Sequence, residues 1–182
     1  MLWSGVWGEW GHVLRPALLG LVVALAAIRL LVRLRMLRGV PQQRAWRYSV
    51  AEVGMIAGTA PWVWMILTPR PGDRALSLVP FRDLAAQLGG PVAGVVVQVG
   101  GNLLVLAALG FFLPLRFRLA PDTGRHAVAV LTRVAVLAAG VSATVEALQY
   151  VLDLGRVASV DDVLVNTVGA VLAALCSRRW WL

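Results

Sequence analysis

The chain has 182 residues, of which 59% are hydrophobic and 14% are charged. About a quarter of the residues of an ordinary soluble domain are charged. The composition therefore excludes such a domain and predicts an all-α polytopic membrane protein, with residues 1–182 forming a single transmembrane domain. The single cysteine, Cys176, has no partner for an intramolecular disulfide, and no second thiol or histidine pair offers a metal site. We therefore expect no metal and no cofactor.

Five apolar stretches are long enough to cross a hydrocarbon core about 30 Å thick as helices. They cover residues 13–34, 50–68, 92–115, 126–151 and 160–176. Pro61 is expected to kink the second of them, because proline removes a helical hydrogen bond. The sequence thus predicts a bundle of about five transmembrane helices.

A short amphipathic helix is predicted in the connection between the second and third stretches. Phe81, Leu84, Ala85 and Leu88 recur there at spacings that place them on one helical face. Such a helix lies at the membrane surface. It either covers polar residues as a lid or simply anchors the connection to the surface.

Arginines gather in alternate connections between these stretches. With the N-terminus outside the cell, the inner segments carry Arg35, Arg38, Arg44, Arg47, Arg116, Arg118, Arg125, Arg178 and Arg179. The outer segments are nearly neutral. Because cytoplasmic loops accumulate positive charge, we expect a plasma-membrane protein with its N-terminus outside and its C-terminus in the cytoplasm. This topology also explains the net charge of +8, so we expect membrane lipids as partners and no nucleic acid.

Three of the predicted spans carry pairs of polar residues at helical spacing. Residues three or four positions apart share a helical face. In the expected topology all the pairs fall in the outer half of the membrane, so they are predicted to converge on one site. The pairs are Gln98 with Asn102, Glu146 with Gln149, and Asp162 with Asn166.

The Glu146 carboxylate is costly within a membrane helix unless it is paired or faces water. Arg156, in the next connection, is expected to reach Glu146 and to be shared with Asp161 or Asp162. Asp161 is expected to cap the fifth helix, because carboxylates stabilise free N–H groups at a helix start. Asp162 is expected to point inward, because it shares a stripe with Asn166.

Two glycines beside these polar residues are predicted to let helices approach closely. They are Gly101, next to Asn102, and Gly169, seven positions after Asp162. The alternative to a ligand site is that the polar pairs only tie the helices together by interhelical hydrogen bonds.

The residue order in this region resembles the signature of the VanZ-like family of small bacterial membrane proteins. The resemblance lies in E-A-L-Q from Glu146, in G-R ending at Arg156, and in D-D-V-L-V-N-T-V-G-A from Asp161. Pro80 and Phe81 resemble a Pro-Phe pair that follows the family's second span, and GNLLVLAALGFFLP resembles its Asn-led third span. The resemblance extends over about residues 67–174. Residues of the expected types stand at Asn102, Glu146, Gln149, Arg156, Asp162, Asn166 and Gly169.

The family is named for a member linked to low-level teicoplanin resistance, so the resemblance implies an envelope protein that lowers susceptibility to lipoglycopeptide antibiotics. A pocket of carboxylates, amides and arginine suits a lipid-linked cell-wall precursor or the lipoglycopeptide itself. Two other functions stay open. One is a membrane-embedded enzyme that uses Glu146 or Asp162 as general acid or base on a lipid-linked phosphate or sugar, although the sequence contains no catalytic motif. The other is a structural subunit of an envelope complex.

Overall fold

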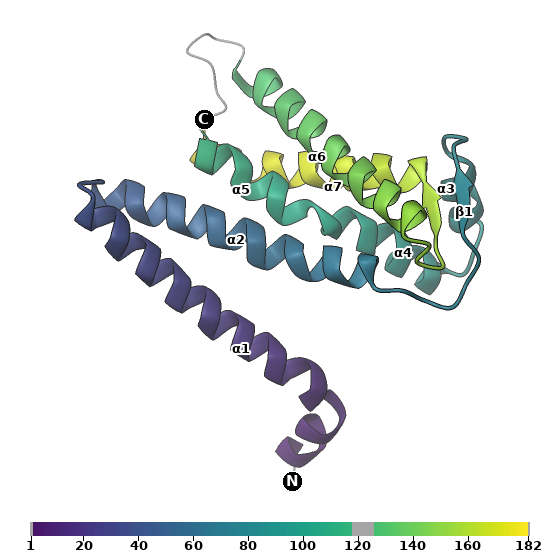
Figure 1. The fold of residues 1–182 in the computed structure, drawn as a ribbon, viewed down its shortest axis with the longest axis horizontal. Helices are drawn as coiled ribbons and strands as arrows, with labels where there is room; N and C mark the ends of the chain where they lie inside the picture. Colours follow the sequence, from purple (N-terminus) through teal and green to yellow (C-terminus); the bar gives the residue numbers. More distant parts are fainter. Residues whose placement is uncertain (1, 118–125, 182) are drawn as a thin grey trace.

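A computed structural model describes residues 2–117 and 126–181 of the chain and shows a bundle of helices (Figure 1). The predicted helical membrane fold is confirmed. The predicted inner-loop residues Arg118 and Arg125 lie outside the described residues. The long helices are α1 (Leu2–Leu37), α2 (Gln42–Leu67), α4 (Val92–Val105), α5 (Ala107–Phe117), α6 (His126–Val151) and α7 (Val160–Cys176), with the short 3-10 helix η1 (Arg178–Trp180) after them.

Within the described part of the chain, four helical segments are long and apolar enough to cross a membrane. They are Arg15–Leu37, Gln42–Leu67, Val92–Phe117 and Ala127–Val151. The fifth predicted span is α7, which has the predicted bounds but only 17 residues. At about 1.5 Å per residue it is about 26 Å long, slightly less than a hydrocarbon core.

Three of the predicted spans differ from the helices of the structure. The first helix runs on to Leu37 and the second begins at Gln42, so Arg35, Arg44 and Arg47 belong to helices and not to a loop. Arginine is a good helix former, and its long stem lets the charge reach water from within a helix. The third span is broken at Leu106 into α4 and α5. This break accompanies close packing of both halves on α7.

Helix α7 lies at the centre of the bundle and packs against α4, α5 and α6. Backbones approach at two glycines: a Cβ added to Gly169 would lie 2.0 Å from the Leu103 carbonyl oxygen, and one added to Gly110 would lie 2.0 Å from the Ala170 oxygen. Only glycine fits at either position. The packing role predicted for Gly101 was wrong, because a Cβ there would meet nothing within 4 Å. Gly101 faces open space beside α4.

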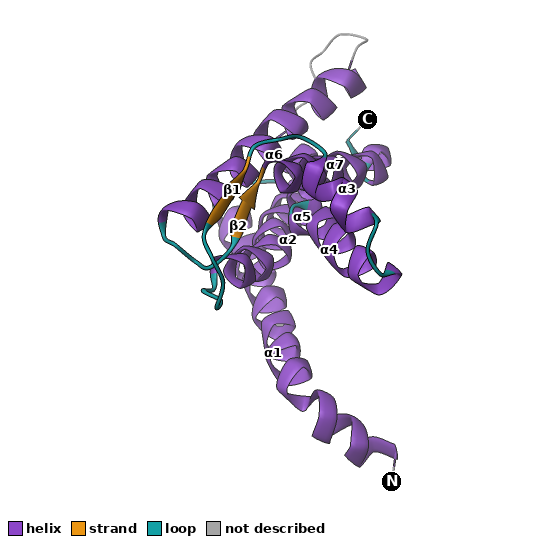
Figure 2. Ribbon diagram, turned by 90° about the vertical axis from the view of Figure 1, so that its right-hand side faces the viewer, coloured by secondary structure: helices purple, strands orange, loops and turns teal. Residues whose placement is uncertain are grey.

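One end of the bundle is closed by two short strands and a short helix, and we call it the capped end (Figure 2). Strand β1 (Ala75–Ser77) pairs in parallel with β2 (Val157–Ser159), which leads directly into α7. Helix α3 (Arg82–Leu88) follows β1 and contacts both α4 and α7. A short helix is therefore present in this connection as predicted, but Phe81 of the predicted apolar face precedes it with a φ of 65°. The sheet was not predicted.

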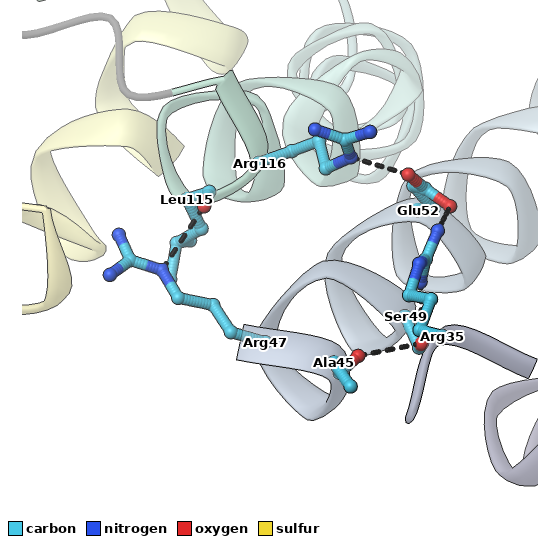
Figure 3. Close-up of polar contacts among 7 residues, drawn as sticks. All are labelled: Arg35, Ala45, Arg47, Ser49, Glu52, Leu115 and Arg116. Atoms are coloured by element: carbon cyan, nitrogen blue, oxygen red, sulfur yellow. Dashed lines mark hydrogen bonds and ion pairs between the residues drawn. The ribbon is translucent and has the colours of Figure 1, made fainter. Parts of the chain in front are cut away.

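The opposite end of the bundle, which we call the arginine end, brings together the connection between α1 and α2, the last turn of α5 and the C-terminal residues (Figure 1). Glu52 on α2 accepts hydrogen bonds from Arg35 on α1 and Arg116 on α5 (Figure 3). Arg47 donates to the backbone oxygens of Leu115 and Trp180, each over 3.1 Å. These contacts hold the arginine-rich segments at one end of the bundle.

Candidate functional site

A polar cavity of about 490 Å³ lies at the capped end, between α3, α4, α6, α7 and the connections that carry the strands. The volume is within the range of small-molecule sites, about 300–1,000 Å³. All the polar side chains predicted to converge line this cavity: Gln98, Asn102, Glu146, Gln149, Arg156, Asp162 and Asn166. The structure thus brings the predicted residues together, while their role in ligand binding stays a prediction.

A side-chain hydrogen bond joins α4 to α7 along one wall of the cavity. The Asn102 amide nitrogen donates to the Asp162 carboxylate, so Asp162 has the inward orientation that its helical stripe predicts. One turn further along α7, the Asn166 amide donates to the Ser142 hydroxyl over 2.8 Å. Gln98 lines the cavity from an exposed position one turn before Asn102.

The Glu146 carboxylate is buried where α6 meets the start of α7, and the residue is 8% exposed. It accepts a hydrogen bond from the Ser159 backbone N–H over 3.0 Å. The Ser159 hydroxyl in turn donates to Asp83 on α3 over 2.6 Å and accepts from the Asp161 N–H over 3.2 Å. Ser159 therefore connects α3, α6 and α7 at the edge of the cavity.

The expected capping role of Asp161 on its own helix was wrong. The residue that caps α7 is Ser159, whose hydroxyl accepts from the first turn. The buried Asp161 carboxylate instead accepts from the backbone N–H groups of Phe81, over 2.5 Å, and Leu84, over 2.9 Å. It therefore caps α3, because both groups are free donors at the start of that helix.

Arg156 lines the same cavity as Glu146 and Asp162, but the expected ion pairs do not form within the described structure. Among the described residues Arg156 forms no ion pair with Glu146, Asp161 or Asp162. Its guanidinium donates to the backbone oxygens of Met65, over 3.0 Å, and Thr68, over 3.4 Å. Carbonyls at the end of α2 lack helical partners and carry the negative end of the helix dipole, so they compete with the carboxylates for this cation.

Two buried polar atoms of the cavity lining have no hydrogen-bond partner in the described structure. They are the Arg156 Nε, which is a donor, and the Asn166 Oδ1, which is an acceptor. Asn166 is only 3% exposed. A buried polar group without a partner costs about 1–3 kcal/mol. The cavity can therefore hydrogen-bond a molecule that supplies an acceptor near Arg156 and a donor near Asn166.

Sequence reasoning missed several polar residues of the cavity. Asp83 and Gln87 are one turn apart on the polar face of α3, and both line the cavity, while Phe81 and Leu88 are exposed on that helix. Hydrogen bonding to Ser159 and then to Ser77 lowers the pKa of Asp83 below its ordinary value. The serine directly before V-D-D was a recognisable helix-cap signal, and it would have identified Ser159.

An apolar groove of about 350 Å³ adjoins the polar cavity on the other side of β2. Its lining consists of Leu76, Leu78, Ala143, Glu146, Ala147, Tyr150, Val151, Ala158, Ser159, Val160 and Val163. Glu146 and Ser159 line both spaces. Side chains of a strand alternate between its two faces, so Val157 lines the cavity and Ala158 lines the groove.

Comparison with known proteins identifies the family of the chain. The family model described as VanZ/LLP1 matches residues 46–181, a range that contains every residue lining the polar cavity and leaves out α1. Neither the curated proteins nor the solved structures gave a match. Within residues 2–117 and 126–181, no three His, Cys, Asp or Glu side chains are grouped so as to hold a metal ion. The chain, a helical membrane protein, belongs to the VanZ/LLP1 family.

Proposed function

We propose that this protein binds the polar head of a lipid-linked envelope molecule in the polar cavity, and that this binding lowers susceptibility to teicoplanin-type glycopeptides. The observation that carries the proposal is that the polar cavity and the apolar groove adjoin each other. A cavity lined by carboxylates, amides and arginines shares Glu146 and Ser159 with an apolar groove. An amphiphilic ligand has a polar part and a hydrocarbon part that match these two linings.

The unpartnered atoms of the lining support binding over a purely structural role. If the polar residues only tied the helices together, their buried hydrogen-bonding capacity would be used up within the bundle. Asn166 Oδ1 and Arg156 Nε instead have no partner among the described residues. A ligand supplies the missing partners.

The proposal places the capped end at the outer face of the plasma membrane. Its support is the charge distribution, because Arg35, Arg47 and Arg116 gather at the opposite end. In this orientation α3 lies in the outer interface. The exposed Phe81, just before α3, and Leu88 at its end then face lipid, and the polar face of α3 covers the cavity.

Antibiotic susceptibility tests this function. Variants Glu146→Gln, Arg156→Ala and Asp162→Asn are produced at matched membrane levels in a host that lacks the protein. Each is expected to abolish protection against a lipoglycopeptide, and Arg156→Lys is expected to restore part of it, because lysine keeps the charge but not the forked geometry. Asp153→Asn is the matched control, since Asp153 is an exposed acid at the same end that lines neither space.

The same variants separate the competing functions. Wild-type protection by Glu146→Gln, which keeps size and hydrogen bonding, would favour a structural subunit and contradict the proposal. Glu146 and Asp162 line one cavity, and a pair of carboxylates can serve as general acid and base. Turnover of a labelled lipid-linked precursor by the intact protein would therefore favour the enzyme, and protection without turnover would favour binding.

A further inference from the structure

Two arginines from connections that pack against each other line the polar cavity. Arg70 follows α2 and Arg156 precedes β2, and both line the cavity. The Arg70 N–H donates to the Leu154 oxygen over 3.0 Å. Gly155 has a φ of 63°, and a Cβ added to it would lie 1.9 Å from the Arg70 oxygen. This close backbone contact needs glycine at position 155, and it holds the two connections together beside the cavity.

In the described part of the chain the two arginines are not held in close ion pairs, although the carboxylates of Asp83, Glu146 and Asp162 line the same cavity. Neither Arg70 nor Arg156 forms an ion pair with a carboxylate among the described residues. Arg156 uses one guanidinium nitrogen for the carbonyls at the end of α2, and its buried Nε has no partner. Two positive charges near each other repel, so an anion that binds between the two guanidinium groups is stabilised by both.

We infer that Arg70 and Arg156 bind a phosphate group and that the ligand of the polar cavity is a phosphate ester. This inference rests on the proposed function and names the chemical class of its ligand. A phosphate monoester carries a charge of about −1.5 to −2 and three acceptor oxygens, so it matches two guanidinium forks better than a carboxylate does. Asn166 Oδ1 requires a donor, which the phosphate dianion does not supply. The esterified group therefore carries a hydroxyl or an amide.

Calorimetric titration of the full chain tests the inference. The protein is held in uncharged maltoside micelles, because phospholipid would itself supply phosphate. The probes are dihexanoyl phosphatidate and dihexanoylglycerol, which differ only in the phosphate. We expect the phosphatidate to bind at least about tenfold more tightly, the effect of one charge-assisted hydrogen bond. Equal binding of the two probes would overturn the inference.

Variants assign the effect to the arginine pair. Arg70→Gln and Arg156→Gln are each expected to weaken phosphatidate binding by about tenfold or more. Arg74→Gln is the control, because Arg74 lies in the same connection but stacks on Tyr150, 4.9 Å from the ring centre, and does not line the cavity. An equal loss in Arg74→Gln would show only a general surface charge effect and would overturn the inference. Arg70 is exposed and its side chain forms no ion pair, so its variant tests the site even if Arg156→Gln fails to fold.

Two further results distinguish a lipid phosphate from a soluble one, and the phosphate site from the proposed function. Inorganic phosphate that displaces the phosphatidate at equal concentration would assign the phosphate to a soluble molecule, and failure to displace it would assign it to a lipid. Loss of lipoglycopeptide protection in Glu146→Gln, together with no preference for phosphatidate, would contradict the phosphate site alone and leave the proposed function standing.

Discussion

Ser159 donates its backbone N–H to Glu146 Oε2 over 3.0 Å, and this bond joins α6 to the first residue before α7. Both residues line the polar cavity and the apolar groove, so the bond lies in the wall between the two spaces. Glu146 therefore has a backbone partner at the position where the sequence predicted an arginine. Arg156 instead donates to the Met65 and Thr68 oxygens, and its Nε, which has no partner among the described residues, remains available to a ligand.

Removing the Ser159 hydroxyl should loosen the capped end. Ser159→Ala loses the cap of α7 and the bond to Asp83, so we expect a loss in unfolding free energy of about 1–2 kcal/mol. The measurement is denaturant unfolding in detergent. Thr144→Ala is the matched control, because among the described residues the Thr144 hydroxyl bonds only to the Gly140 oxygen of its own helix. Equal stability of Ser159→Ala and Thr144→Ala would contradict the role assigned to Ser159.

Adding one methyl group at Gly169 should force α7 away from α4. A Cβ there would lie 2.0 Å from the Leu103 oxygen, so we expect Gly169→Ala to lower the unfolding free energy by about 1–3 kcal/mol. Gly101→Ala adds the same group where nothing lies within 4 Å. It should be neutral or slightly stabilising, because alanine favours helices over glycine. Thermal unfolding of the two variants measures both effects. A Gly101→Ala variant less stable than Gly169→Ala would contradict the packing of α7 on α4.

Helical spacing in the sequence predicted which polar residues share a face, and these residues form much of the cavity lining. Glu146 with Gln149 and Asp162 with Asn166 needed only the helical repeat and the bounds of α6 and α7, which the apolar stretches gave correctly. Close approach at Gly169 could be predicted in the same way. Gly101 shows the limit, because a small residue indicates tight packing only when another helix lies opposite it.

The hydrogen-bond partners could not be predicted, because they depend on how distant segments meet. Strands β1 and β2 have three residues each, too few for an alternating pattern to be recognised, and they pair across about 80 positions of sequence. That pairing brings α3 over α7 and gives Asp161 its partners at Phe81 and Leu84. Arg156 likewise binds carbonyls of α2, and no sequence pattern marks a helix end as the better partner.

The orientation in the membrane is predicted from the arginines and has a direct test. A reporter that is active only in the cytoplasm, fused after Leu182, should be active, and the same reporter placed between Gly89 and Gly90 should be inactive. Both glycines are exposed beyond the end of α3, so an insertion there should be tolerated. Activity at the glycine site and none at the C-terminus would invert the topology and place the cavity on the cytoplasmic side.

Photocrosslinking in intact cells tests most directly whether the polar cavity holds a lipid-linked ligand. A photoreactive amino acid is placed at Ala86, which lines the cavity, or at Ala85, its exposed neighbour on α3 that does not. Mass spectrometry of the adducts should find one predominant amphiphile at Ala86, lost when Asp162→Asn is added, and a mixture of bulk lipids at Ala85. The same mixture at both positions, unchanged by Asp162→Asn, would contradict the proposal that the cavity binds a specific ligand.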